Sequence, residues 1–459
     1  MSTAAEAAAR PAGPPRARGR PLGGMAIARL AFDLGGIALS AAIGIAGARL
    51  LGPAGKGDLA VLAVLATIGI HLSATGIGEA AIVGVARRRA AEGPAFATAV
   101  AWSLAVGCLC AAMLGILAAT ALSIPVSPTV LLIATAPLGA LVVNANQFLL
   151  LRGRIATIGA ISVASLGVTL AGYLLVALSG VPRLAGAAAA GLAGAALAVA
   201  ATGCVTLRQG LRPSRRLDRV FLRWAIGYGA VAELAYLIGT VSARGDTVLV
   251  YSLAGQREAG LYSVALTYGV TVAAAPWALS YVSFPRLAHV PAGEAAGAIA
   301  EVCRVGIVAS IAVSAPAAIA APFLIPLAFG SSFAGAGAAA VILTLGTTAV
   351  AAQVLLCRGV AARGHPRAML ASYLSNVATM VGLDLVLIPW IGLSGAALGS
   401  VCSALVGFVA IRIGARRWAR REGIDPALLH LVPGRADVHH LRAAVSSLLA
   451  RAAATGRRA

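Results

Sequence analysis

Long apolar stretches, separated by short polar connections, make up nearly all of this chain. Each stretch holds about 20 mostly apolar residues, the length at which a helix crosses the hydrocarbon core of a bilayer. The pattern therefore predicts about twelve spans. The first six cover Met25–Leu51, Asp58–Val85, Phe96–Leu122, Thr129–Leu151, Ala156–Leu178 and Leu184–Leu207. The second six cover Phe221–Leu253, Gly260–Phe284, Ile299–Phe329, Gly335–Leu356, Ala368–Ile391 and Ser394–Ile413.

The composition agrees with a membrane protein. Of 459 residues, 60% are hydrophobic and only 11% are charged, whereas roughly 25% are charged in an average soluble domain. So few charges do not cover a water-facing surface, and we conclude that lipid is the main solvent. The many Ala and Gly residues let membrane helices approach one another closely. The predicted fold class is an all-α polytopic membrane protein.

Arginine residues lie in every second connection between the predicted spans. These connections hold Arg87–Arg89, Arg152, Arg154, Arg208–Arg223, Arg286, Arg358–Arg367 and Arg412–Arg421. The opposite connections hold little beyond Lys56, Arg183 and Arg257. Positive residues accumulate on the cytoplasmic side of membrane proteins, so we expect both termini in the cytoplasm and an even number of spans. The net charge of +21 follows from this topology, and we exclude nucleic acid as a partner.

The longest basic connection, Arg208–Trp224, divides the chain into halves of about six spans each. We expect five parts along the chain. These are a disordered cytoplasmic tail (1–24), an N-terminal six-helix bundle (25–207), a basic cytoplasmic linker (208–220), a C-terminal six-helix bundle (221–413) and a basic cytoplasmic tail (414–459).

Two sequence matches indicate that the halves are repeats. LGPAGKGDLAVL (51–62) aligns with AGQREAGLYSVA (254–265), so that Gly52 falls on Gly255 and Gly57 on Gly260. LAGAALA (192–198) aligns with LSGAALG (393–399) at nearly the same shift. Parallel repeats of six spans are typical of transporters, with the substrate path between the halves. Chance matching in an Ala- and Gly-rich chain is the alternative. In either case, the turns need glycines that accept positive φ.

Four segments, in order along nearly the whole chain, resemble one known family. RGDTVLVYSLAGQREAGLYSVALTYGVTVAAAPWALSYVSFPRLA (244–288) resembles the seventh and eighth spans of the polysaccharide-biosynthesis flippases. LLGPAGKGDLAVL (50–62) resembles the turn between the first two spans of that family. PFLIPLAFGSSFAGA (322–336) and LDLVLIPWIGLSGAALGS (383–400) resemble the ninth-to-tenth and eleventh-to-twelfth junctions.

This resemblance places the chain in the multidrug/oligosaccharidyl-lipid/polysaccharide exporter superfamily. It implies two six-helix bundles around a central cavity and transport by alternating access. The implied substrate is an oligosaccharide on polyprenyl diphosphate, moved across the bacterial inner membrane for surface polysaccharides such as lipopolysaccharide. The expected partners are this lipid-linked oligosaccharide, membrane lipids, a coupling proton or Na⁺, and polysaccharide polymerases or glycosyltransferases.

Charged side chains within the spans are the candidate substrate ligands, because an unpaired charge at the bilayer centre costs at least ~2.5–3.5 kcal/mol. By resemblance, Arg49 and Arg244 hold the diphosphate, since a planar guanidinium binds phosphate oxygens in pairs. Asp246 would orient Arg244, although the alternative for both is an ion pair that packs helices or a helix end near the interface. Arg29 is a further candidate, and it lies four residues before Asp33, with which it can pair.

Acidic residues within the spans are the candidates for binding a coupling ion. These are Glu233, Asp33, Glu79 and Asp384, each of which has a buried, hydrogen-bonded role as its alternative. Glu79 follows Gly76 and Gly78, where we expect the second span to unwind. Three amides near the end of the fourth span, Asn144, Asn146 and Gln147, are candidates for contacting sugar hydroxyls or for joining helices.

No motif for enzymatic catalysis is present in the sequence. We find no GxxxxGK[ST], HExxH or GxSxG, and the six cysteines form no CxxC pair or Cys/His cluster, so we expect no enzyme activity, no metal and no cofactor. A cation-coupled multidrug exporter of the same superfamily is the main alternative function. A peptidoglycan-precursor flippase and a non-transporting scaffold for polysaccharide assembly are two others.

Overall fold

The computed structural model describes residues 22–86, 90–214, 217–273, 287, 290–363, 365–439 and 441–442, and every regular element in these ranges is a helix. The N-terminal lobe comprises α1 (Leu22–Ala74), α2 (Ile77–Ala86), α3 (Glu92–Thr120), α4 (Val126–Ile133), α5 (Thr135–Leu151), α6 (Ile155–Leu178) and α7 (Arg183–Arg208). The C-terminal lobe comprises α8 (Arg219–Arg244), α9 (Asp246–Ala254), α10 (Gln256–Val272), α12 (Ala292–Phe329), η1 (Ser331–Ala336), α13 (Gly337–Ala362), α14 (Pro366–Ile391), α15 (Leu393–Arg421) and η2 (Pro426–Leu428).

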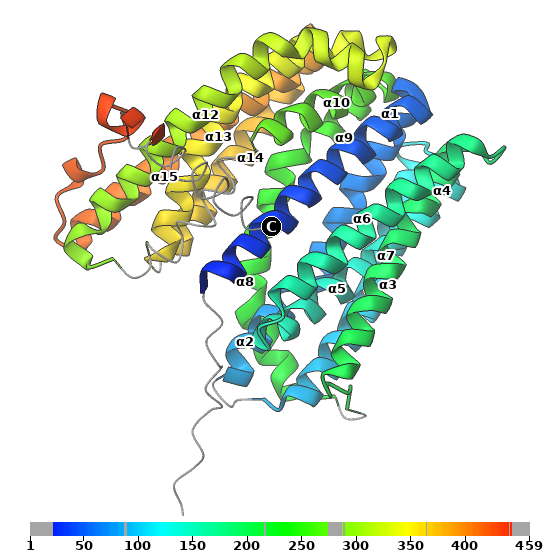
Figure 1. Cartoon of the computed structure of the whole chain (residues 1–459), viewed down its shortest axis with the longest axis horizontal. Coiled ribbons are helices and arrows are strands. Elements are labelled where there is room, and N and C mark those ends of the chain that lie inside the picture. The colour runs from blue at the N-terminus through cyan, green and yellow to red at the C-terminus, as the bar shows by residue number, and fades with distance from the viewer. Residues whose placement is uncertain are drawn as a thin grey trace, which may run out of the picture.

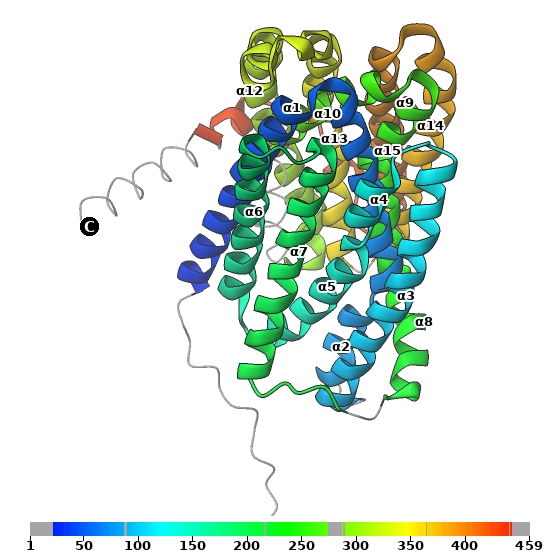
Figure 2. The ribbon, with the colours of Figure 1, turned by 90° about the vertical axis from the view of Figure 1, so that its right-hand side faces the viewer.

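The two lobes lie side by side, with their helices running in roughly the same direction. Helices α3 to α7 lie on one side and α12 to α15 on the other, while α1, α9 and α10 lie between them (Figure 1). Helix α1 packs against α10 of the other lobe. The view turned by 90° shows the connections gathered at two opposite ends of the helices (Figure 2).

The expected multi-pass membrane architecture is confirmed. In the part of the chain that the structure describes, nine helices are long and apolar enough to cross a membrane, and a bent pair within α8 raises this to ten. One of the nine, Leu34–Val85, is folded at Gly52 and therefore supplies two crossings. The predicted eighth span begins as α10 and continues into 274–286, which lie outside the described residues.

Glycines in the left-handed region form the turns at one end of the molecule. Gly52, Gly255, Gly330 and Gly392 have φ of 67°, 91°, 110° and 59°. We call this the glycine end. The opposite end, where Arg152 follows α5 and where α7 and α15 finish in arginines, is the arginine end. The prediction of positive φ is confirmed for Gly52 and Gly255, which occupy equivalent places in the two repeats.

Gly57 and Gly260, the second pair of repeated glycines, have a different role. Neither has a positive φ; instead, each lies against the backbone of the other repeat. A Cβ on Gly57 would overlap the carbonyl oxygen of Gln256, and a Cβ on Gly260 would overlap that of Pro53. Pro53 and Gln256 are themselves equivalent in the repeat alignment. The contact is therefore reciprocal, and it joins the two lobes at the glycine end.

The predicted break in the second span is confirmed. Helix α1 ends at Ala74 and α2 begins at Ile77, with Thr75 at φ 45° and Gly76 at φ 67° between them. A Cβ on Gly76 would lie 2.6 Å from the carbonyl carbon of Gly229, and the reverse distance is also 2.6 Å. The break thus brings α1 and α8, from different lobes, into backbone contact.

Candidate functional site

Asp246 is the centre of a buried polar cluster in the C-terminal lobe. It follows Gly245, where α8 ends and α9 begins, and only 1% of its surface is exposed. Its carboxylate accepts hydrogen bonds from the Thr247 backbone N–H (2.7 Å), the Ser400 hydroxyl (2.6 Å) and the Tyr262 hydroxyl. These bonds and the N-terminal end of the α9 dipole stabilise a negative charge at this position.

Asp384 on α14 is completely buried, and it lies against Gly399, the residue before Ser400, which donates to Asp246. Neither of its carboxyl oxygens has a hydrogen-bond partner among the described residues. A Cβ at Gly399 would overlap its Oδ1, so the glycine on α15 makes room for the carboxyl group. The charges of Asp384 and Asp246 act on each other. Two carboxylates at short range repel each other unless a proton or a metal cation is shared between them. This pair has the chemistry of a cation site.

Arg244, two residues before Asp246, is exposed, and no described residue pairs with it by a hydrogen bond or a short ion pair. Its positive charge acts on that of Lys56. Lys56 lies on α1 in the other lobe and is 9% exposed, with its ammonium beside Gly47 and Tyr173. It likewise makes no hydrogen bond with the described part of the chain. Two cationic groups, one from each lobe, therefore face the same region, and this arrangement favours an anion between the lobes.

Arg49 forms hydrogen bonds with the end of α12. Its Nε and Nη2 atoms each donate a hydrogen bond of 2.7 Å, to the carbonyl oxygens of Ala328 and Leu327 respectively. These carbonyls are the unpaired acceptors at the C-terminal end of α12, where a cation is stabilised by the helix dipole. Arg49 thus links the lobes at the glycine end, and its role as a phosphate ligand stays a prediction.

Glu233 and Glu79 meet between α1, α2 and α8. The Glu233 carboxylate lies 2.7 Å from Nδ1 of His71, which bridges α8 to α1 across the two lobes. The charges of Glu233 and His71 both act on Glu79, which lies at the start of α2 just after the break. The structure therefore brings two of the predicted coupling residues together and adds a histidine to them.

The three amide candidates differ in their surroundings. Asn144 is buried and makes hydrogen bonds that join helices: it accepts from the Gly78 N–H (2.8 Å) and donates to the Ser103 hydroxyl (2.8 Å). The side-chain oxygen of Asn146 is buried without a partner among the described residues. Gln147 lies beside Gly78. Glycan contact stays a prediction for all three.

Several predicted features lie outside the described residues. The side chains of Arg29 and Asp33 are among them, although the backbone of both belongs to α1. So are the basic residues Arg87–Arg89 and Arg286, and residues 440 and 443–459 of the predicted C-terminal tail.

Sequence reasoning missed four residues of the site. Lys56 was assigned to a connection, yet it is the chain's only lysine and lies inside the repeated turn, which was a usable signal. Tyr262 and Ser400 were noticed only as parts of family-like motifs. His71 stands alone in an apolar span, where sequence reasoning favours a packed neutral residue over a ligand.

Comparison with known proteins gives a family and a fold. The model of a family described as polysaccharide biosynthesis protein matches residues 47–337. No curated protein matches the chain. The fold is similar to a multidrug resistance MATE family transporter of the MOP superfamily in an inward-facing conformation (TM-score 0.65, 16% identity, 87% of this chain, 99% of that one). It is also similar to the lipid II flippase MurJ in an inward closed conformation (0.67, 12%, 85% and 87%). A mutant of the Vibrio cholerae MATE transporter VcmN is similar as well (0.62, 15%, 87% and 98%).

Proposed function

The chain belongs to the polysaccharide biosynthesis protein family, and from this membership we propose that it is a flippase for polyprenyl-diphosphate-linked oligosaccharide. It acts in the bacterial inner membrane and supplies surface polysaccharide synthesis. Polysaccharide polymerases or glycosyltransferases act before or after it on the same lipid-linked chain.

The arginine end faces the cytoplasm, and both termini lie on that side. The support for this orientation is the concentration of arginines at one end, since positive residues are retained in the cytoplasm. The glycine end then faces the opposite side of the membrane. The lobes are joined there through Gly57, Gly260 and Arg49, and we infer that substrate enters from the cytoplasmic leaflet.

One observation carries the proposal: Arg244 from one lobe and Lys56 from the other act on each other by their charges, and neither forms a hydrogen bond with the described residues. The charge of Asp246 also acts on Arg244, but its carboxylate already accepts three hydrogen bonds from other groups. Two like charges repel, and the burial of Lys56 adds to the cost of keeping it charged. A diphosphate between them removes that cost and forms charge-assisted hydrogen bonds to both. The headgroup thereby links the lobes, and its release accompanies their separation.

A cation held by Asp384 and Asp246 couples the cycle to an ion gradient. The support is the burial of both carboxyl groups and the lack of any hydrogen-bond partner for Asp384 in the described ranges. A proton or Na⁺ neutralises the pair. Tyr262 and Ser400, which donate to Asp246 from α10 and α15, sense whether that cation is present.

The test uses a deletion strain that carries single variants of the full-length protein. Arg244→Gln and Lys56→Gln remove the paired positive charges. Arg257→Gln removes an exposed charge from the first turn of α10 and serves as the matched control. A lost charge-assisted hydrogen bond is worth about 1.5–3 kcal/mol, so we expect export to fall at least about tenfold in the first two variants and to stay near wild type in the third.

Export is measured as surface polysaccharide and as lipid-linked repeat units that accumulate inside the cell, with protein levels checked by immunoblot. In proteoliposomes, a polyprenyl-diphosphate oligosaccharide with a fluorescent sugar is the probe, and Asp384→Asn should abolish its dependence on an ion gradient. Normal export by Arg244→Gln and Lys56→Gln would refute the anion site. Drug sensitivity of the deletion strain with normal polysaccharide would instead support the multidrug exporter.

A further inference from the structure

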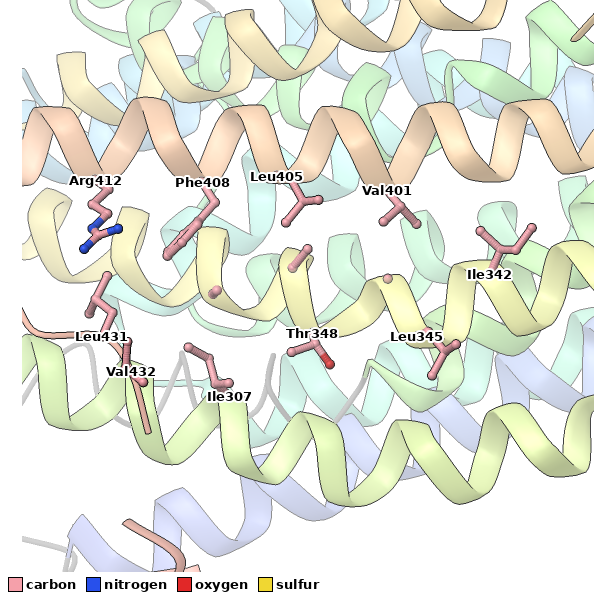
Figure 3. Close-up of a pocket in the computed structure, with 13 residues that line it drawn as sticks. Ile307, Ile342, Leu345, Thr348, Val401, Leu405, Phe408, Arg412, Leu431 and Val432 are labelled. Carbon is pink, nitrogen blue, oxygen red and sulfur yellow. The ribbon is translucent and has the colours of Figure 1, made fainter. Parts of the chain in front are cut away.

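We propose that a groove in the C-terminal lobe, away from the lobe junction, binds one anionic phospholipid of the cytoplasmic leaflet. The groove has a volume of about 560 Å³ and runs between α12, α13 and α15. Its walls are apolar: Ile307 comes from α12, Leu345 from α13, and Leu405 and Phe408 from α15 (Figure 3). Leu345 and Leu405 are 52% and 47% exposed, so the groove is open to lipid along its side.

The length of the groove equals the depth of one leaflet. Four residues of α15 line it at helical spacing, Val401, Leu405, Phe408 and Arg412, so they form a single stripe. With a rise of 1.5 Å per residue, this stripe extends for about 16 Å. The hydrocarbon core of a bilayer is about 30 Å thick, so the stripe covers about half of it. An acyl chain from the cytoplasmic leaflet matches that depth.

Arg412 supplies the charge at the end of the groove. It lies nearest the arginine end, and its guanidinium points from α15 into the groove, on the side where Leu431 and Val432 lie (Figure 3). Its Nε atom is buried and has no hydrogen-bond partner among the described residues. A buried donor without a partner costs about 1–3 kcal/mol, and a phosphate oxygen removes this cost.

The segment that follows α15 holds the polar end of the groove in place. Leu431 and Val432 contribute to its lining. The segment is fixed to α12 by Arg304, whose Nε donates to Asp437 (3.1 Å) and whose Nη1 donates to the His430 carbonyl (2.8 Å). Asp437 is paired with Arg304, and no described carboxylate forms a hydrogen bond or ion pair with Arg412. The charge that faces the groove is therefore positive, and it complements an anionic headgroup in the leaflet where such lipids are concentrated.

The occupant is a phospholipid and not the transported substrate, because the groove lies on the outer face of the C-terminal lobe. It is lined by α12, α13 and α15, whereas Arg244 and Lys56 lie on α8 and α1. A lipid seated there packs against three helices and the following segment at once. It therefore stabilises the C-terminal lobe without entering the transport path.

The experiment measures lipid retention by the purified full-length protein with native mass spectrometry. The probes are phosphatidylglycerol and phosphatidylcholine with identical acyl chains, titrated separately. Arg412→Gln removes the charge from the groove, and Arg417→Gln removes an exposed charge from the next turn of α15 as the matched control. Ala349→Phe fills the groove without changing any charge.

We expect wild type and Arg417→Gln to bind phosphatidylglycerol more tightly than phosphatidylcholine, by about fivefold, the effect of roughly one positive residue near an anionic lipid. Arg412→Gln should lose this preference, and Ala349→Phe should lose both lipids. Thermal unfolding of each variant identifies any that fails to fold, and Arg412→Lys should then retain the preference. Equal binding of the two lipids by wild type, or an unchanged preference in Arg412→Gln, would overturn the proposal. Copurification of a polyprenyl lipid in the groove would overturn it too.

Discussion

The substitution Gly57→Ala should weaken the junction of the two lobes. An ideal Cβ on Gly57 would lie 2.9 Å from the carbonyl carbon of Gln256 and 3.0 Å from the backbone nitrogen of Gly260, and closer still to the Gln256 oxygen. Ordinary contacts of a Cβ lie at 3.4–4 Å, so the methyl group enters backbone atoms by about half an ångström or more. Backbone cannot rotate away as a side chain can, so α1 and α10 must separate.

The added methyl group overpacks the contact between the lobes, and this makes the joined state less stable. Overpacking of this kind costs about 1–3 kcal/mol. The cost applies only while the lobes are joined at the glycine end, so the population ratio of closed to open states should fall by about 5- to 150-fold. Gly260→Ala should act in the same way, because its Cβ would lie 2.7 Å from the Pro53 carbonyl carbon.

The assay is a distance measurement between spin labels across the glycine end. Leu178 at the end of α6 and Trp390 near the end of α14 are 87% and 82% exposed, so cysteines there accept labels in a background that lacks the six native cysteines. We expect a longer or broader distance distribution in Gly57→Ala. Gly115→Ala, in α3, is the matched control because its Cβ meets no atom within 4 Å. Identical distributions in Gly57→Ala and Gly115→Ala would refute the argument that this contact holds the lobes together.

Two further predictions concern ion pairs. Arg152→Ala should lower the stability by about 1 kcal/mol, since the guanidinium forms two half-exposed hydrogen bonds to Glu92 (2.9 and 2.8 Å). Those bonds raise the pKa of Arg152. A base whose pKa is raised on folding contributes its full stabilisation at every pH below its pKa in the unfolded chain. The difference in melting temperature between wild type and Arg152→Ala should therefore be the same at pH 6 and pH 9. His71→Gln and Glu233→Gln should each destabilise the protein, and the double variant should cost less than the sum of the two, by about 1.5–3 kcal/mol. Additive effects in thermal unfolding would contradict a direct bond between them.

Hydropathy predicted the membrane crossings because one apolar helix of sufficient length is a local property of the chain. The break at Gly76 and the turns at Gly52 and Gly255 were predictable for the same reason, since positive φ is a demand on a single residue. The site was less accessible to such reasoning. Arg244 and Asp246 were identified because charges are rare within spans, but their surroundings depend on which helices meet.

The roles of Gly57 and Gly260 show where local reasoning stops. A turn requires a particular φ, whereas a close approach requires a neighbour, and these two glycines are about 200 positions apart in the sequence. Glu233, which bonds His71, is 162 positions away, and Arg244, whose charge acts on Lys56, is also far along the chain. Asp384 was a candidate from its charge alone, and only the packed structure shows that its carboxyl oxygens lack partners among the described residues.

The reciprocal contact of Gly57 and Gly260 also bears on the origin of the molecule. A contact in which equivalent residues of two parallel repeats exchange places is what a symmetric homodimer makes across its two-fold axis. An ancestor of about half this length would have made the same contact between two identical subunits. In such a dimer, a side chain at the position of Gly57 would have clashed at two symmetry-related contacts. If the two halves arose by duplication of one gene, the two sites could then have varied separately, yet both positions in this chain carry glycine.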